Sequence, residues 1–199
     1  MKVIGLTGSV AMGKSEAARY LASLGFPVFD ADREVHKLYD SAEGAAILSP
    51  YAPEVVKDGK VDRQRLSALV LRDPALMKKV EALVHAEIRD RRNDFVAESK
   101  AAGAKAVILD IPLLFETGSE KDMDTTIVVS SSPENQRARA LSRPGMTEEK
   151  LQMILARQMP DGQKRAKADH IIENDGSLAD LEKGLAALLK ELRLTKSNA

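Results

Sequence analysis

The chain has 199 residues, with 30 Lys and Arg against 30 Asp and Glu, 44% hydrophobic residues and no Cys. This length can bury about 70% of the surface that the unfolded chain would expose, so one compact unit with an insertion needs no cross-link. The lack of Cys excludes disulfides, thiolate nucleophiles and Cys-ligated zinc. A net charge of zero gives no overall field for a polyanion, which disfavours proteins that bind nucleic acids or membrane surfaces.

No run of about 18 apolar residues occurs, and the apolar stretch at the start of the chain is too short for the core of a signal peptide. We therefore expect a soluble cytoplasmic protein without a nucleic-acid or membrane partner. Its expected assembly is a monomer or a small homo-oligomer.

Five short apolar runs indicate the strands of one sheet. They do not alternate between apolar and polar residues, which is typical of parallel strands covered by helices on both faces. Stretches of helical periodicity separate them, so we expect a three-layer α/β/α fold with five parallel strands. The expected strands are 2–7, 26–29, 106–109, 125–130 and 170–173. The expected helices are 14–24, 133–141, 147–158 and 178–192, the last with Ser177 as its N-cap.

The long interval between the second and third expected strands shows helical spacing and no strong strand run. We expect residues 33–104 to form a helical acceptor-binding insertion, and the charged stretch 89–94 within it to be a solvated helix face. Residues 133–169 contain eight basic and five acidic side chains and are expected to form a lid. The core then consists of 1–32, 105–132 and 170–199.

Residues 8–15, Gly-Ser-Val-Ala-Met-Gly-Lys-Ser, match the phosphate-loop motif G-x-x-x-x-G-K-[ST] between an expected strand and an expected helix. Gly8 and Gly13 stand where the loop, in wrapping a phosphate, requires a missing Cβ or a positive φ. Lys14 can reach the β- and γ-phosphates, and Ser15 can offer its hydroxyl to Mg²⁺. An ordinary glycine-rich turn explains neither residue, so the motif predicts a nucleoside triphosphate site with Mg²⁺.

Acidic residues follow two of the expected strands, where parallel strands face a ligand crevice. Asp30 and Asp32 would point to the same side if the second strand stayed extended, and one of them is a candidate base toward an acceptor hydroxyl. The alternative for Asp32 is an N-cap of the following helix. Asp110 follows four apolar residues in the manner of a Walker B acid that organises Mg²⁺ or its waters.

A phosphate loop does not identify the acceptor. The N-K-x-D motif of GTPases is missing, and aromatic residues are too few for base stacking by a nucleic-acid motor. A small kinase fits better, because it needs a phosphate loop, an acceptor-holding insertion and arginines that stabilise the transferring phosphoryl group. These residues leave the acceptor open, and a nucleoside monophosphate is one alternative. A protein of a different class, which senses ATP without catalysis, is the other alternative.

With these residues in view, the chain resembles the dephospho-coenzyme A kinase family from about residue 3 to about residue 189. The motifs that carry the resemblance are Gly5-Leu6-Thr7-Gly8, Asp30-Ala31-Asp32, Asp62-Arg63, Leu83-Val84-His85, Pro112-Leu113-Leu114-Phe115-Glu116, Arg139, Arg143, Arg157-Gln158, Ala168-Asp169 and Ile171-Ile172-Glu173-Asn174. The sequence departs from the family pattern at the less glycine-rich middle of the loop, at Glu16 in place of threonine, and at Ala86 in place of proline.

The resemblance implies transfer of the γ-phosphate of ATP to the ribose 3′-hydroxyl of dephospho-coenzyme A, with Mg²⁺. It implies Asp32 as the base, Arg139 as the side chain that steadies the transferring group, and Lys14 as a further catalytic residue. The implied ATP-binding residues are Gly8, Ala11, Met12, Gly13, Lys14, Ser15, Glu16 and Arg143. The implied acceptor-binding residues are Thr7, Asp32, His85, Pro112 and Leu113, and Ser15 and Asp110 are the implied magnesium residues.

Overall fold

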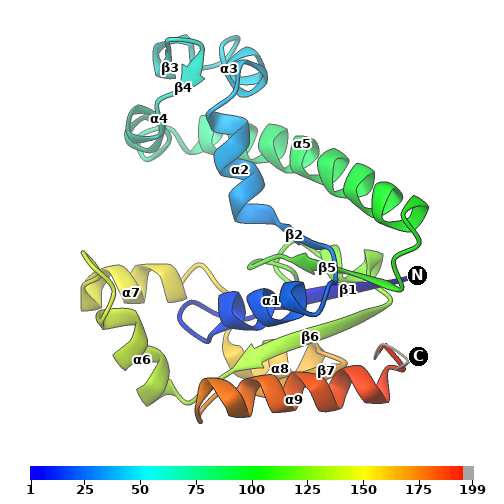
Figure 1. The fold of residues 1–199 in the computed structure, drawn as a ribbon. Coiled ribbons are helices and arrows are strands. Elements are labelled where there is room, and N and C mark those ends of the chain that lie inside the picture. Colours follow the sequence, from blue (N-terminus) through cyan, green and yellow to red (C-terminus); the bar gives the residue numbers. More distant parts are fainter. Residues whose placement is uncertain (195–199) are drawn as a thin grey trace. The chain divides into compact units, whose positions relative to one another are not determined.

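The structure is a computed structural model that describes residues 1–194. The chain forms two compact units: the first joins Met1–Phe29 to the part of the chain that begins at Val96, and the second comprises Asp30–Phe95. Figure 1 labels the helices and strands of both. Within the described residues, no helix combines the length and the apolar character needed to cross a membrane.

A parallel five-stranded sheet has the order β2-β5-β1-β6-β7. In the central strand β1, Leu6 pairs with Asp110 of β5 on one side and with Ile127 of β6 on the other. Every residue of β5 and β6 is buried, as expected for strands with helices on both faces. The expected parallel sheet is therefore confirmed. Its strands are β1 (Lys2–Thr7), β2 (Val28–Asp30), β5 (Ala106–Asp110), β6 (Thr125–Ser130) and β7 (His170–Glu173).

Helices that follow these strands cover the sheet. The helices of the first unit are α1 (Lys14–Ser23), α6 (Pro133–Leu141), α7 (Glu148–Leu155), α8 (Asp161–Lys167) and α9 (Leu178–Glu191), with the short 3₁₀ helix η2 (Ser119–Asp122). The N-cap expected for α9 is confirmed: the Ser177 hydroxyl accepts from the backbone N–H of Asp180, and the Asp180 carboxylate accepts from the backbone N–H of Ser177. The helix expected at 147–158 is shorter than predicted and spans only Glu148–Leu155.

One face of the sheet packs against α1 and α9, where Leu6 of β1, Leu21 of α1 and Leu185 of α9 share a hydrophobic cluster. The other face carries a separate cluster that includes Phe115 and Val128, with α8 beside β6. Burial of side chains of this size contributes about 1.5–3 kcal/mol each before the entropy of ordering them is subtracted. The two clusters confirm the expected three-layer fold, and they leave the carboxyl ends of the strands to form the site.

The second unit is mainly helical. Its core includes Leu38, Leu48, Val55 and Val84, all at most 5% exposed. It consists of α2 (Ala31–Tyr39), α3 (Ala42–Leu48), the 3₁₀ helix η1 (Pro53–Val55), β3 (Val56–Lys57), β4 (Lys60–Val61), α4 (Arg63–Val70) and the part of α5 (Pro74–Ala101) that precedes Val96. The antiparallel β3–β4 hairpin was not expected from the sequence.

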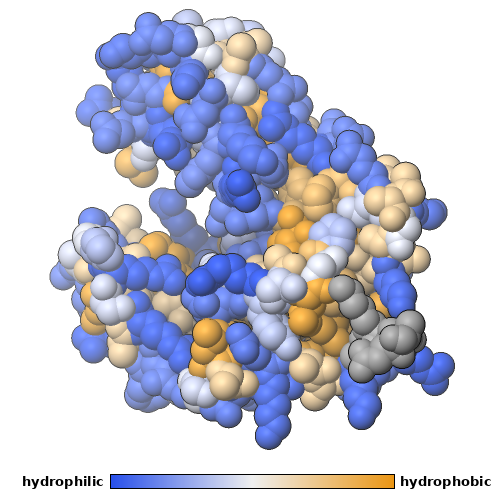
Figure 2. All heavy atoms as spheres, in the orientation of Figure 1, coloured by the Kyte–Doolittle hydropathy of each residue, from blue (hydrophilic) through white to orange (hydrophobic). Residues whose placement is uncertain are grey.

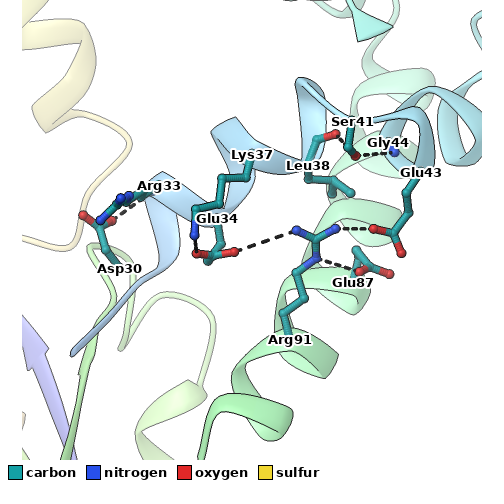
Figure 3. A network of polar contacts seen from close by, with 10 residues as sticks. All are labelled: Asp30, Arg33, Glu34, Lys37, Leu38, Ser41, Glu43, Gly44, Glu87 and Arg91. Carbon is teal, nitrogen blue, oxygen red and sulfur yellow. Dashed lines mark hydrogen bonds and ion pairs between the residues drawn. The ribbon is translucent and has the colours of Figure 1, made fainter. Parts of the chain in front are cut away.

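The charged stretch 89–94 is not the fully solvated helix face that its composition predicts. Arg92 is only 8% exposed. Arg91 contacts three carboxylates of the same unit: Glu87 at 2.9 Å, Glu34 at 3.8 Å, and Glu43 (Figure 3). Arg91 thereby links α5 to α2 and α3. On the face of this unit that is turned toward the viewer in Figure 2, most of the surface is hydrophilic, as is usual for a protein surface.

Candidate active site

The phosphate loop connects β1 to α1, and its two motif glycines have no room for a side chain. A Cβ added at Gly8 would lie 2.6 Å from the backbone oxygen of Val129. Gly13 has a φ of 98°, and a Cβ there would lie 1.9 Å from the Asn174 side-chain nitrogen. Close packing at both positions and the positive φ of Gly13 exclude a Cβ, which is the reason the motif has glycine there.

Asn174 explains why Gly13 is approached so closely. It follows β7, is 7% exposed, and its side-chain amide donates to the backbone oxygen of Met12 at 2.9 Å. Ser131, just after β6, donates its backbone N–H to the sulfur of the same Met12 at 3.2 Å. The carboxyl ends of two neighbouring strands therefore support the last turn of the loop before α1.

Lys14, the first residue of α1, forms an ion pair with Asp110 at the end of β5. The side chains are 15% and 4% exposed, so little water screens their attraction. The pairing brings the predicted phosphate-binding lysine and the predicted Walker B acid together at one end of the sheet. A triphosphate bound in the loop would meet a lysine whose ammonium is already held there.

The residues predicted for Mg²⁺ suit a hard cation. Ser15 is an exposed residue in the first turn of α1, and Asp110 provides a carboxylate. Magnesium is usually held by one or two such oxygens together with waters and substrate phosphates. In the described part of the chain, no group of three or more His, Cys, Asp or Glu residues could hold a metal ion.

A pocket of about 410 Å³ opens beside the loop. It brings together four of the predicted ATP-binding residues and the predicted catalytic residue Arg139. Its lining also includes side chains that the sequence did not single out. The lining residues are Ala11, Gly13, Glu16, Arg139, Arg143, Asn174, Gly176, Leu178 and Leu181.

The two arginines of this pocket are held differently. Arg139 on α6 donates to the backbone oxygen of Asn174 at 2.7 Å and to the Ser131 hydroxyl at 3.3 Å, so its guanidinium is fixed against the sheet. Arg143 lies just beyond the end of α6 and is exposed. Glu16 also lines the pocket and pairs with Arg19 one turn along α1, which partly offsets its negative charge.

The predicted acceptor residues of the first unit meet at a loop after β5. The Thr7 hydroxyl donates to the backbone oxygen of Pro112 at 3.1 Å, and Thr7 itself is fully buried. The buried ammonium of Lys164 donates to the same oxygen at 3.0 Å and pairs with Glu116 at 2.8 Å. Leu113, by contrast, is 36% exposed. Side chains of β1 and α8 therefore both hold the loop that follows β5 at Pro112.

Asp32 and His85 belong to the second unit. The strand before Asp32 ends at Asp30 and α2 begins at Ala31, so the extended geometry that would have put Asp30 and Asp32 on the same side does not persist. The alternative of a cap at Asp32 is also wrong, because the N-cap is Asp30, whose carboxylate accepts from the N–H of Arg33 at 3.0 Å (Figure 3). Asp32 is an exposed acid in the first turn of α2, and His85 is exposed within an unbroken α5.

Asp175, next to Asn174, ties the end of β7 to the start of α6. Its carboxylate accepts from the Ser132 backbone N–H and the Ser131 hydroxyl, both at 2.7 Å, and from the Asn135 amide at 2.9 Å. These hydrogen bonds, led by the one from Ser132, hold the pKa of Asp175 well below its usual range. Asp175 therefore stays ionised and fixes the wall of the pocket.

Sequence reasoning gave no role to three amide side chains that contact the loop: Asn174, Gln136 and Gln158. Only Asn174 had a local signal, since it follows the last expected strand at the end of the sheet where ligands bind. The two glutamines come from the region predicted as a lid. Gln158 belongs to the Arg157-Gln158 motif of the family resemblance, but no contact with the loop was predicted from that motif.

Comparison with known proteins gives one consistent family. The family model described as dephospho-CoA kinase matches residues 2–180. A dephospho-CoA kinase of Bradyrhizobium diazoefficiens is 46% identical over 192 residues, which is 96% of each chain. The solved structure of dephospho-CoA kinase from Campylobacter jejuni is 30% identical, with a TM-score of 0.72 over 96% of both chains. A shikimate kinase from Bacteroides thetaiotaomicron, 15% identical with a TM-score of 0.53 over 97% of this chain and 99% of its own, shares the fold.

Proposed function

The chain belongs to the dephospho-CoA kinase family, and we propose that it transfers the γ-phosphate of ATP to the ribose 3′-hydroxyl of dephospho-CoA, giving CoA and ADP. The observation that carries this proposal beyond family membership is the Lys14–Asp110 ion pair at the phosphate loop. This ion pair brings a lysine and a carboxylate together at the loop that follows the central strand, as a site for a triphosphate and Mg²⁺ requires.

In this proposal ATP occupies the pocket beside the loop, with its phosphates on the backbone N–H groups at the start of α1. Lys14 offsets charge on the β- and γ-phosphates, and Arg139 faces the group in transfer. Arg143, which is exposed at the end of α6, closes over the nucleotide. Ser15, and Asp110 through water, would hold Mg²⁺, which offsets phosphate charge when bound.

The acceptor-binding residues of this proposal are the ones that the family resemblance implies: Thr7, Asp32, His85, Pro112 and Leu113. Asp32 orients the ribose hydroxyl and takes its proton as the oxygen attacks the γ-phosphorus, while the bond to the β-phosphate oxygen breaks and ADP leaves. The exposed position of Asp32 in the first turn of α2 leaves its carboxylate available for this role.

The test is ADP release by the purified protein with Mg-ATP and a panel of acceptors: dephospho-CoA, AMP and shikimate at equal concentrations. We expect release to depend on dephospho-CoA. Faster release with AMP or shikimate would assign a different acceptor. ATP binding without acceptor-dependent release would support the sensing protein instead.

A further inference from the structure

The peptide groups of Val10, in the middle of the phosphate loop, are held by two glutamines from distant parts of the chain. Gln136 on α6 donates its side-chain N–H to the backbone oxygen of Val10 at 2.9 Å. The backbone N–H of Val10 donates to the side-chain oxygen of Gln158, which follows α7, at 3.0 Å. One loop residue therefore has its donor and its acceptor satisfied by two separate side chains.

The two glutamines have opposite chemical roles. A backbone N–H can only donate and a backbone carbonyl can only accept, so Gln136 must present nitrogen and Gln158 must present oxygen. Gln136 is 8% exposed, so water does not readily replace its amide. Loss of either partner would leave a polar group of the loop unsatisfied in a partly buried setting.

The surroundings of Val10 connect the middle of the loop to the same part of the chain. The next residue, Ala11, has a φ of 62°, a left-handed conformation that a residue with a Cβ adopts only when its neighbours impose it. Ala11 is buried against Ala140 of α6 and Leu151 of α7, and Val10 packs at the edge of the same cluster. The middle of the loop thus packs against α6, which carries Gln136, and α7, which precedes Gln158.

We propose that Gln136 and Gln158 are positioning residues that keep the phosphate loop in its nucleotide-binding shape and make that shape depend on α6 and α7. Through them, the region that carries Arg139 and Arg143 is coupled to the loop that binds the triphosphate. The proposal deepens the proposed function and rests on ATP being the ligand of the loop. It does not depend on which acceptor is phosphorylated.

The opposite roles allow a matched test by equilibrium titration with ATP. Gln136→Glu replaces the required donor with an acceptor that faces the Val10 oxygen, whereas Gln158→Glu keeps an acceptor for the Val10 N–H. Both variants add one negative charge beside the same residue, so repulsion of the triphosphate is similar in both. We expect the Kd for ATP to rise at least tenfold more in Gln136→Glu than in Gln158→Glu. Equal increases would overturn the proposal.

A second comparison uses only position 158, which is partly exposed. Gln158→Leu removes the acceptor, and we expect it to raise the Kd for ATP, while Gln158→Glu binds ATP more tightly than the leucine variant despite its added charge. The reverse order would contradict a hydrogen-bonding role. This pair keeps the test decisive if Gln136→Glu does not fold.

The control is Gln163→Glu, which adds the same charge at an exposed position of α8 and should leave the Kd for ATP unchanged. The KM for dephospho-CoA, measured in the variants that turn over, should change little, since the glutamines contact the nucleotide loop. A merely structural role would lower thermal stability and raise both constants together. Because the titration needs no acceptor, its outcome is separate from that of the acceptor panel.

Discussion

Arg139 donates to the backbone oxygen of Asn174 at 2.7 Å, and the side-chain amide of Asn174 donates in turn to the backbone oxygen of Met12 in the phosphate loop at 2.9 Å. The arginine proposed to face the transferring phosphate is therefore also a support of the residue that shapes the loop. Its planar guanidinium bridges the ends of β6 and β7, because it also reaches the Ser131 hydroxyl.

This geometry predicts that Arg139→Lys is not conservative. A lysine keeps the charge but not the planar fork that reaches two acceptors at once. We expect kcat to fall by about 10²-fold, the usual effect of removing one donor from a developing charge. Steady-state kinetics with Mg-ATP and dephospho-CoA measure it, with Arg137→Lys on the exposed side of α6 as the control. If Arg139→Lys is as active as the unchanged protein, the positive charge of Arg139 matters and its planar guanidinium does not.

Asp32→Asn tests the proposed base. The substitution keeps the size of the side chain and removes its ability to take a proton, so we expect kcat to fall by about 10²- to 10⁴-fold, with the Kd for ATP nearly unchanged. Asp30→Asn is the matched comparison, because asparagine retains an oxygen for the cap of α2. We expect the larger loss at Asp32. Undiminished turnover in Asp32→Asn would remove it from the chemistry.

The features that sequence reasoning predicted well are those in which neighbours along the chain are neighbours in space. The strand, loop and helix around Lys14 are consecutive, and their spacing alone indicated a phosphate site. The apolar runs of β5 and β6 likewise showed their burial without reference to the rest of the fold. The β3–β4 hairpin had a local signal that was overlooked: Asp58 and Gly59 have φ values of 51° and 73°, and Asp-Gly favours such a two-residue turn.

Other features depend on contacts between distant residues, which no local pattern contains. Arg91 lies in a run of charges that looked solvated, and only the fold places Glu43 and Glu34 beside it. Gln136 and Gln158 are separated from Val10 by 126 and 148 residues. Their contacts with Val10 could not be predicted, since glutamine is usually a surface residue and the Arg157-Gln158 motif does not indicate the partner of its glutamine.

Lys164→Met tests the buried ion pair behind the Pro112 loop. Lys164 is fully buried and pairs with Glu116, so its removal leaves a carboxylate without its cation. We expect a loss of about 3–5 kcal/mol in the free energy of unfolding, measured by urea denaturation. Glu116→Gln in the same chain removes the uncompensated charge, and the double variant should be more stable than Lys164→Met alone. Losses that simply add would show that the pair is not coupled.

Asp175→Asn gives a prediction about pH. The pKa of Asp175 in the fold lies below its ordinary value of 3.8, chiefly because the Ser132 N–H donates to the ionised carboxylate. A carboxyl group with a lowered pKa stabilises the fold fully above its ordinary value, and this contribution is lost as the pH falls through the folded pKa. Asparagine keeps one oxygen acceptor but no charge. We therefore expect Asp175→Asn to have a lower Tm at pH 7, and the difference to shrink as the pH falls below 3.8.

Thermal unfolding monitored by circular dichroism from pH 7 downward measures this difference. Asp94→Asn, at an exposed position of α5, is the control for loss of one surface charge, and its Tm should follow that of the unchanged protein throughout. A Tm difference for Asp175→Asn that stays constant as the carboxylate is protonated would contradict the assignment. In that case shape rather than charge would account for the role of Asp175, and the link from β7 to α6 would not require an ionised carboxylate.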